Sequence, residues 1–159
     1  MKVVINRCYG GFSLSTKAVE MVMNKKGLDC FRYVQTKYKN EDGVDEFTRY
    51  NRFEAEEYMN QELSLDKLFL VYHYARDLGE KVEELVDEGF WYEKYLERDD
   101  ADLVAVVEEL GEKANGKTAK LKVVEIDDDM KWCIESYKGV ETICKARRKN
   151  QQKKIVYKG

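Results

Sequence analysis

The fold is decided by the opening stretch KVVINRCYGGFSLSTKAVEMVM, residues 2–23. Its Val- and Ile-rich start, residues 2–8, predicts a buried strand that leads through a Gly-Gly turn into a helix. Ser15 is a favourable N-cap for this helix, and Gly27 is a favourable stop. A second strand is predicted at residues 31–34. The stretch therefore predicts a strand–helix–strand unit of an α/β protein.

The C-terminal half repeats this alternation. The spacing predicts a helix over 100–114, because apolar residues recur on one helical face at Leu103, Val106, Val107, Leu110 and Ala114. A strand follows at 121–126, and residues 132–144 predict a hairpin closed by the two-residue turn Lys138-Gly139. We predict an α/β fold with helices packed on a small mixed sheet and a C-terminal β-hairpin.

Between these two blocks the composition becomes acidic and aromatic. Helical spacing appears over 65–75 and again over 82–86, and residues 90–95 are interpreted as a strand that returns to the sheet. We interpret residues 38–94 as an inserted helical subregion. Its aromatic residues are expected to form mainly core, with some left for a homo-oligomer face or a lid over the ligand site.

Charge is unevenly spread along the chain. The net charge is −3, yet residues 145–159 hold seven Lys or Arg and no acid, so the remainder is strongly acidic. An acidic body repels nucleic-acid backbones, so general nucleic-acid binding is not expected. We predict a single domain over residues 1–145 and a solvated basic tail over 146–159.

The sequence also indicates where the protein resides. No segment approaches the roughly 20 consecutive apolar residues of a membrane span, and the N-terminus lacks the pattern of a signal peptide. The four cysteines contain no CxxC pair, which disfavours a zinc site and fits a reducing compartment. We predict a cytoplasmic protein without a membrane partner.

The Gly-Gly turn is the first candidate site. Unpaired amides and the helix dipole at a helix N-terminus favour an anion such as a phosphate, with Ser13 and Ser15 as further donors and Tyr9 or Phe12 stacking on a base. The alternative is structural: the glycines make a tight connection and the aromatic rings fill the core. The full set of predicted ligand-binding residues is Asn6, Arg7, Tyr9, Gly10, Gly11, Phe12, Ser13, Ser15, Arg98 and Asp100.

Arg98 and Asp100 belong to this set because they stand at the start of the second helix. One interpretation has Arg98 reach a phosphate or ribose while an acid holds it in place. The other is that helix capping accounts for one of the two acids, with Asp99 and Asp102 approximating a capping box.

Catalytic and metal sites find weaker support. Cys8 lacks an adjacent base and is interpreted as buried and inert, and His73 as a packed or partly exposed side chain. Glu125 and Asp127–Asp129 either bind a divalent cation or form a solvated turn, and the turn is favoured. We therefore expect no catalytic residue, no metal and no cofactor.

Two sequence blocks resemble a family of small proteins encoded by tailed phages and prophages, which has no established activity. The first is VINRCYGGFSLS, residues 4–15, and the second runs from Arg98 to Glu141. The chain departs from the family pattern at Asp127, where Pro is expected, and at 146–148, where a His-Arg ending is expected. Residues 37–94 have no counterpart in the shorter members.

The resemblance implies a phage accessory protein that acts in the cytoplasm of an infected bacterial host. By analogy with phage proteins that trap host immune nucleotides, we expect it to bind and sequester a nucleotide-derived signal, such as a cyclic ADP-ribose derivative, without catalysis. Two alternatives stay open at this point. One is a metal-dependent hydrolase of a nucleotide signal, and the other is a protein–protein inhibitor of a host factor.

Overall fold

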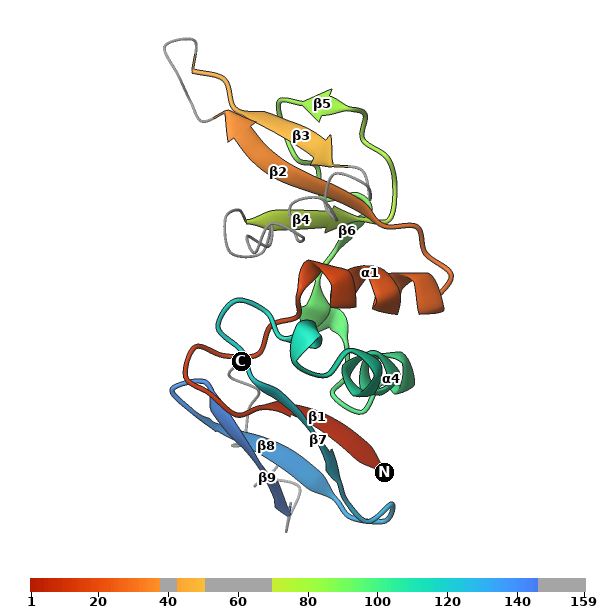
Figure 1. Ribbon diagram of the computed structural model, residues 1–159, viewed down its shortest axis with the longest axis vertical. Coiled ribbons are helices and arrows are strands. Elements are labelled where there is room, and N and C mark those ends of the chain that lie inside the picture. The colour runs from red at the N-terminus through yellow and green to blue at the C-terminus, as the bar shows by residue number, and fades with distance from the viewer. Residues whose placement is uncertain (38–42, 51–69, 146–159) are drawn as a thin grey trace. The chain divides into compact units, whose positions relative to one another are not determined.

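The computed structural model describes residues 1–37, 43–50 and 70–145, and the chain divides into two compact units (Figure 1). The first unit comprises Met1–Ala18 and Leu96–Gly159, and the second comprises Val19–Tyr95. In the described stretches, no helix combines the length and the apolar character that crossing a bilayer requires.

Within its described residues, the first unit combines two antiparallel strand pairs with one α-helix. Its elements are β1 (Lys2–Asn6), α4 (Ala101–Leu110), the 3-10 turn η2 (Gly111–Ala114), β7 (Leu121–Glu125), β8 (Trp132–Tyr137) and β9 (Val140–Lys145). β1 pairs with β7, and β8 pairs with β9. Val3 and Ile5 project from β1 onto Ile134 of β8, and these three side chains form a fully buried cluster. Val4 on the other face of β1 is buried as well, so this strand is buried on both faces.

The C-terminal hairpin forms as the sequence predicts. Tyr137 lies opposite Val140, which leaves Lys138 and Gly139 as the two turn residues. Both have positive φ angles, 52° and 91°. This is the type I′ geometry, whose twist matches that of the two strands. Glycine accepts it without cost, and Lys138 is the only non-glycine residue with positive φ in the described part of the chain.

Helix α4 confirms the second predicted helix. The Asp100 carboxylate accepts hydrogen bonds from the amides of Asp102 and Leu103, both at 3.0 Å. The helix buries its apolar face through Leu103, Val104, Val106 and Val107. It then tightens into η2, so the helical pattern read over residues 100–114 is present as an α-helix followed by one 3-10 turn.

The second unit holds a five-stranded sheet and most of the first helix. Its elements are α1 (Thr16–Lys25, beginning in the first unit), β2 (Phe31–Lys37), β3 (Glu46–Tyr50), β4 (Val71–Tyr74), β5 (Lys81–Val82), β6 (Phe90–Trp91) and the 3-10 turn η1 (Glu93–Tyr95). The strand order is β5-β3-β2-β4-β6. Tyr33, Phe47 and Tyr74 form the centre of the aromatic core. The rings of Tyr33 and Tyr74 meet edge to face at 5.8 Å.

Both ends of α1 follow the sequence signals. The Ser15 hydroxyl accepts a hydrogen bond from the amide of Ala18 at 3.1 Å, as an N-cap does. At the other end Gly27 has a φ of 80°, and the amide of Leu28 donates to the carbonyl of Met23. These bonds satisfy groups that a helix end otherwise leaves unpaired.

The α/β class and the C-terminal hairpin are confirmed. The strand pairs within the described ranges are all antiparallel, so parallel pairs of a mixed sheet are not among them. β2 pairs with β3 and β4 in the second unit, whereas β1 pairs with β7 in the first. The predicted strand–helix–strand unit therefore does not close into one parallel sheet.

The helices predicted in the insertion are wrong wherever the structure describes them. Val71–Tyr74 is strand β4 and Lys81–Val82 is strand β5. Tyr72 and Tyr74 share one face of β4 and lie opposite Tyr33 and Phe31, respectively. The apolar residues of this segment therefore follow the two-residue period of a strand and not the period of a helix. Residues 51–69 and the tail at 146–159 lie outside the described residues.

The predicted limits of the insertion change accordingly. The second unit ends at Tyr95, close to the predicted residue 94, but it begins at Val19 and not near residue 38. The strand predicted at 90–95 is confirmed only at Phe90–Trp91 (β6), which pairs with β4 of the second unit, because Glu93–Tyr95 forms the 3-10 turn η1. Tyr72, Tyr74 and Phe90 pack into the aromatic core, as expected for most of these rings.

Candidate functional site

Asn6, at the end of β1, joins three distant segments of the first unit. Its side-chain amide nitrogen donates to the carbonyls of Cys8 and Gly139, both at 2.7 Å, and its oxygen accepts from the amide of Lys120 at 2.8 Å. The residue is fully buried. We call the three segments, residues 8–11, 117–120 and 137–139, the Asn6 corner. Every polar atom of the Asn6 side chain is engaged in holding it.

Glycines allow the segments of the Asn6 corner to pack backbone against backbone. A Cβ built on Gly139 would overlap the amide nitrogens of Gly10 and Gly11, and one built on Gly10 would lie 2.7 Å from the Cβ of Thr118. The Gly10 amide also donates to the Lys138 carbonyl at 3.4 Å. The amides of the Gly-Gly turn therefore face the hairpin tip. They do not form the predicted cradle for an anion.

A buried ion pair between Arg98 and Glu141 stabilises the Asn6 corner. The Arg98 guanidinium donates to both carboxylate oxygens of Glu141, at 2.6 and 2.9 Å. The Glu141 carboxylate also accepts a hydrogen bond from the backbone amide of Asn6 at 2.7 Å. The guanidinium carbon lies 3.7 Å from the centre of the Phe12 ring. Because two buried charges are tolerated only when they are paired and hydrogen-bonded, this network fixes the end of β1 against β9.

This arrangement corrects the predicted role of Arg98 and Asp100. Arg98 is buried and bound to Glu141, so its guanidinium is not presented to a phosphate. The carboxylate of Asp100 caps α4 and does not hold the arginine. Of the two interpretations offered for this helix start, the structure supports the cap.

Three further predicted ligand-binding residues point into the protein. Phe12 is buried beneath Arg98. The Ser13 hydroxyl oxygen is buried without a hydrogen-bond partner, and a Cβ on Gly116 would overlap it. The Ser15 hydroxyl donates to the Lys113 carbonyl at 2.7 Å and caps α1. The structural interpretation of the Gly-Gly turn therefore holds for Phe12, Ser13 and Ser15, because their side chains serve packing and helix capping.

Arg7 and Tyr9 remain accessible from the predicted set. The Tyr9 side chain is 68% exposed. Arg7 is exposed as well, and its guanidinium donates to the Glu141 backbone carbonyl at 2.7 Å, which leaves its positive charge without a carboxylate partner in this contact.

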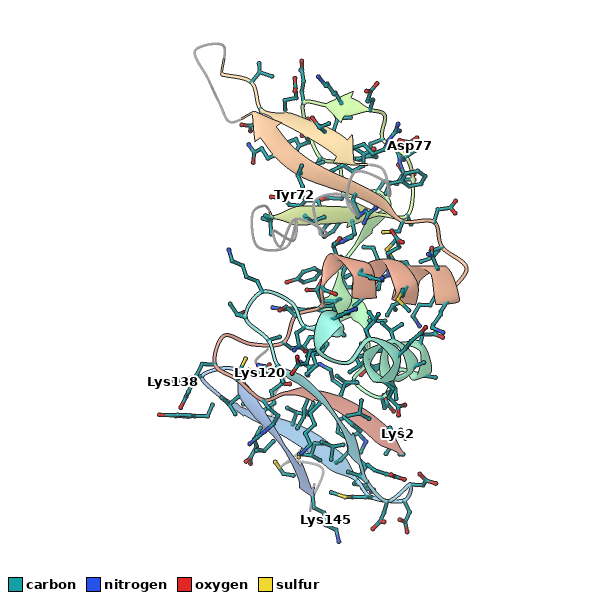
Figure 2. All side chains as sticks on the ribbon, in the orientation of Figure 1. Lys2, Tyr72, Asp77, Lys120, Lys138 and Lys145 are labelled. Carbon is teal, nitrogen blue, oxygen red and sulfur yellow. The ribbon has the colours of Figure 1, made fainter. Side chains whose placement is uncertain are left out.

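The rest of the exposed surface of the corner was not found from the sequence. Tyr137 is 69% exposed, and the Lys138 ammonium lies 5.5 Å from the centre of its ring. Lys117 and Lys120 are exposed on the neighbouring segment, and Figure 2 labels Lys120 and Lys138. The three segments contain no acidic residue. A Tyr-Lys-Gly turn is too short a signal to reveal this surface, because it depends on contacts across more than a hundred residues.

Two of the candidate catalytic or metal-binding residues, Cys8 and Asp128, make structural contacts. The Cys8 thiol donates to the Thr118 carbonyl at 2.8 Å. Asp128 pairs with the N-terminal amine of Met1, which lowers the pKa of that carboxyl. Over residues 1–37, 43–50 and 70–145, no group of three or more His, Cys, Asp or Glu side chains is placed to hold a metal ion.

His73 is packed in the second unit, as predicted. It lies opposite Arg32 in the β2–β4 pair and is 8% exposed. Burial, with the Arg32 charge nearby, lowers the pKa of His73 to about 3. The imidazole is therefore neutral at physiological pH. Arg32 in turn lies 3.5 Å from the Glu20 carboxylate.

No family model, curated protein or solved structure matches the chain. The resemblance to phage proteins therefore stays a prediction, and function is argued from the Asn6 corner itself.

Proposed function

We propose that the Asn6 corner binds a nucleotide-type small molecule, an aromatic base carrying phosphate, and holds it without transforming it. The observation that carries this proposal is the meeting of two exposed tyrosines with exposed cations on a surface whose three segments contain no acid.

The tyrosines supply the affinity for a base. Tyr9 and Tyr137 are exposed, and each precedes in sequence one partner of the hydrogen-bonded contact between Gly10 and Lys138. An exposed aromatic face stacks on any nucleobase and contributes about 1–3 kcal/mol per base. Stacking does not require a deep cavity, which suits a site built on an exposed edge.

The cations supply the affinity for phosphate. Arg7, Lys117, Lys120 and Lys138 are all exposed. They stand on a chain whose remaining residues, outside the basic stretch 145–159, are strongly acidic. A local positive surface on an acidic body attracts a small polyanion while the body repels a long one. This favours a free nucleotide over general nucleic-acid binding.

The buried network preorganises this surface for binding. Asn6 and the Arg98–Glu141 pair fix the backbone beneath Tyr9 and Lys138, so less conformational freedom is lost when a ligand binds. This assigns Asn6, Arg98 and Glu141 a positioning role, whereas the predicted contact residues Arg7 and Tyr9 keep theirs.

Sequestration is the role that this binding would serve. The resemblance to phage proteins suggests that the ligand is a host immune nucleotide, for example a cyclic ADP-ribose derivative, and that the protein acts against host defence. A sequestering protein needs affinity and no catalytic group. Three of the candidate groups make structural contacts: Asp100 caps α4, Asp128 pairs with the N-terminal amine, and the Cys8 thiol donates to the Thr118 carbonyl.

The experiment incubates purified full-length protein with adenosine monophosphate, cyclic ADP-ribose, cyclic dinucleotides and a single-stranded oligonucleotide. After filtration, the retained fraction is heated and the released molecules are identified by mass spectrometry. We expect one or more of the free nucleotides to be retained and released intact. Conversion of the ligand at substoichiometric protein, lost with chelator, would instead indicate the hydrolase.

Matched variants locate the site. Tyr9→Ala should weaken retention about tenfold, because one stacking ring is lost, whereas Tyr95→Ala should not change it. Tyr95 is 67% exposed and lies in the second unit. Lys138→Asn removes a positive charge and introduces a residue type that tolerates positive φ. Its control is Lys131→Asn, which removes the same charge at an exposed position outside the Asn6 corner. Equal loss in both tyrosine variants, or no retention of any nucleotide, would overturn the proposal.

A further inference from the structure

The C-terminal hairpin brings two free cysteines together. Cys133 on β8 lies directly opposite Cys144 on β9 (Figure 1 shows the two strands side by side). Directly opposite residues of an antiparallel pair project from the same face of the sheet. The Cys133 thiol also donates to the Cys144 carbonyl at 3.3 Å, which places its sulfur beside the partner residue.

The hairpin register fixes the spacing of the two residues. The two-residue turn makes Tyr137 and Val140 a hydrogen-bonded pair, and pair types alternate along an antiparallel ladder, so Cys133 and Cys144 form a hydrogen-bonded pair too. The α-carbons of such a pair are about 5.5 Å apart. That spacing falls inside the range of roughly 4.4–6.8 Å that a disulfide spans.

The two thiols differ in accessibility and in chemistry. Cys133 is buried, whereas Cys144 is partly exposed. Burial raises the pKa of the Cys144 thiol to about 12, with further contributions from Glu135 and from Cys133 itself. Only a small fraction of Cys144 is therefore thiolate at neutral pH, and the pair stays reduced until a strong or persistent oxidant is present.

We propose that Cys133 and Cys144 form a redox-active dithiol that a low-molecular-weight disulfide oxidises to a cross-strand disulfide. The Cys144 thiolate attacks glutathione disulfide, forms a mixed disulfide and releases one glutathione thiolate. The Cys133 thiolate then attacks the Cys144 sulfur of that mixed disulfide and releases the second glutathione. The protein loses two protons and two electrons, and one glutathione disulfide becomes two glutathiones.

The resulting bond ties the open end of the hairpin, opposite the Lys138-Gly139 turn. A bridge between neighbouring strands must twist to reach disulfide geometry, and strained disulfides are reduced more readily than structural ones. The dithiol thus forms a reversible modification site. Formation of the disulfide requires no ligand at the Asn6 corner.

The test treats full-length protein with glutathione disulfide at pH 7 to 10, then blocks free thiols and maps the peptides by mass spectrometry. We expect a link between Cys133 and Cys144 within one chain, removed by dithiothreitol. Its rate of formation should rise about tenfold per pH unit, because the thiolate fraction does so below the pKa.

Serine variants separate the dithiol from ordinary thiol oxidation. Cys133→Ser should leave glutathione attached at Cys144, and the double variant Cys8→Ser with Cys30→Ser should form the link as the parent protein does. A link that involves Cys8 or Cys30, links only between chains, or complete blocking of Cys133 and Cys144 after oxidation would each overturn the proposal. The peptide map of the parent protein decides the matter even if a variant fails to fold.

Discussion

At the scale of single residues, the buried ion pair is the feature on which the first unit depends. Glu141 is fully buried and accepts from Arg98 and from the Asn6 amide. The cost of burying these charges is offset only while both are present. The pairing is not visible in the sequence, because the two partners are 43 residues apart.

Replacing the carboxylate tests this dependence. Glu141→Gln leaves the Arg98 charge buried without its partner, so we expect the free energy of unfolding to fall by about 3–5 kcal/mol. Glu109→Gln, at an exposed position of α4, should change it by less than about 0.5 kcal/mol. Denaturant unfolding followed by circular dichroism measures both. Equal stabilities of the two variants would show that the pair is not needed.

His73, the single histidine of the chain, gives the protein a pH dependence of known sign. Its pKa is lowered from 6.5 to about 3 by burial and by Arg32, so the unfolded chain binds the proton and the folded protein does not. The stability that neutral His73 contributes is complete above pH 6.5 and declines as the pH falls toward 3. Between these two pH values, the contribution of His73 to the free energy of unfolding changes by about 1.4 kcal/mol per pH unit.

The variant His73→Gln isolates this contribution, because the carboxylates titrate alike in both proteins. The difference in unfolding free energy between parent and variant should be constant above pH 7 and should shift against the parent protein between pH 6 and 4. Parallel curves over that interval would mean that His73 is protonated within the fold.

At the scale of elements, local signals, including the β8–β9 hairpin, are predicted correctly, whereas pairing between strands that are distant in the sequence is not. The Ser15 cap, an Asp cap at the start of α4 and the Lys138-Gly139 turn act through neighbours only a few residues away, so sequence predicts them, although the capping box was expected at Asp99 and the cap is Asp100. β4 was predicted as helix because its tyrosines also fit a helical spacing, and only the facing strand β2 decides for the period of two. The surface around Tyr9 and Tyr137 was missed for the same reason, since segments more than a hundred residues apart build it.

The glycine at the hairpin tip tests the element-scale packing. Gly139→Ala places a methyl group against the amides of Gly10 and Gly11 and strains a positive φ, so we expect it to destabilise the protein and to reduce nucleotide retention. Gly27→Ala is the matched control, because its φ is also positive but nothing lies within 4 Å of the added carbon. Thermal unfolding should show a larger loss for Gly139→Ala than for Gly27→Ala.

At the scale of the whole molecule, the division into two units assigns the proposed site to one of them. The Asn6 corner, its supporting ion pair and the cross-strand cysteines all belong to the first unit. The second unit contributes an aromatic core and the neutral His73. The account therefore predicts that ligand contacts are confined to the first unit.

The most direct test of this central claim is an NMR titration of the isotope-labelled full-length protein with a nucleotide retained in the filtration experiment, or with cyclic ADP-ribose if none is. The account predicts saturable shifts of the backbone amides at residues 8–11, 117–120 and 137–139. Absence of shifts at millimolar ligand, or shifts centred on the second unit, would contradict it.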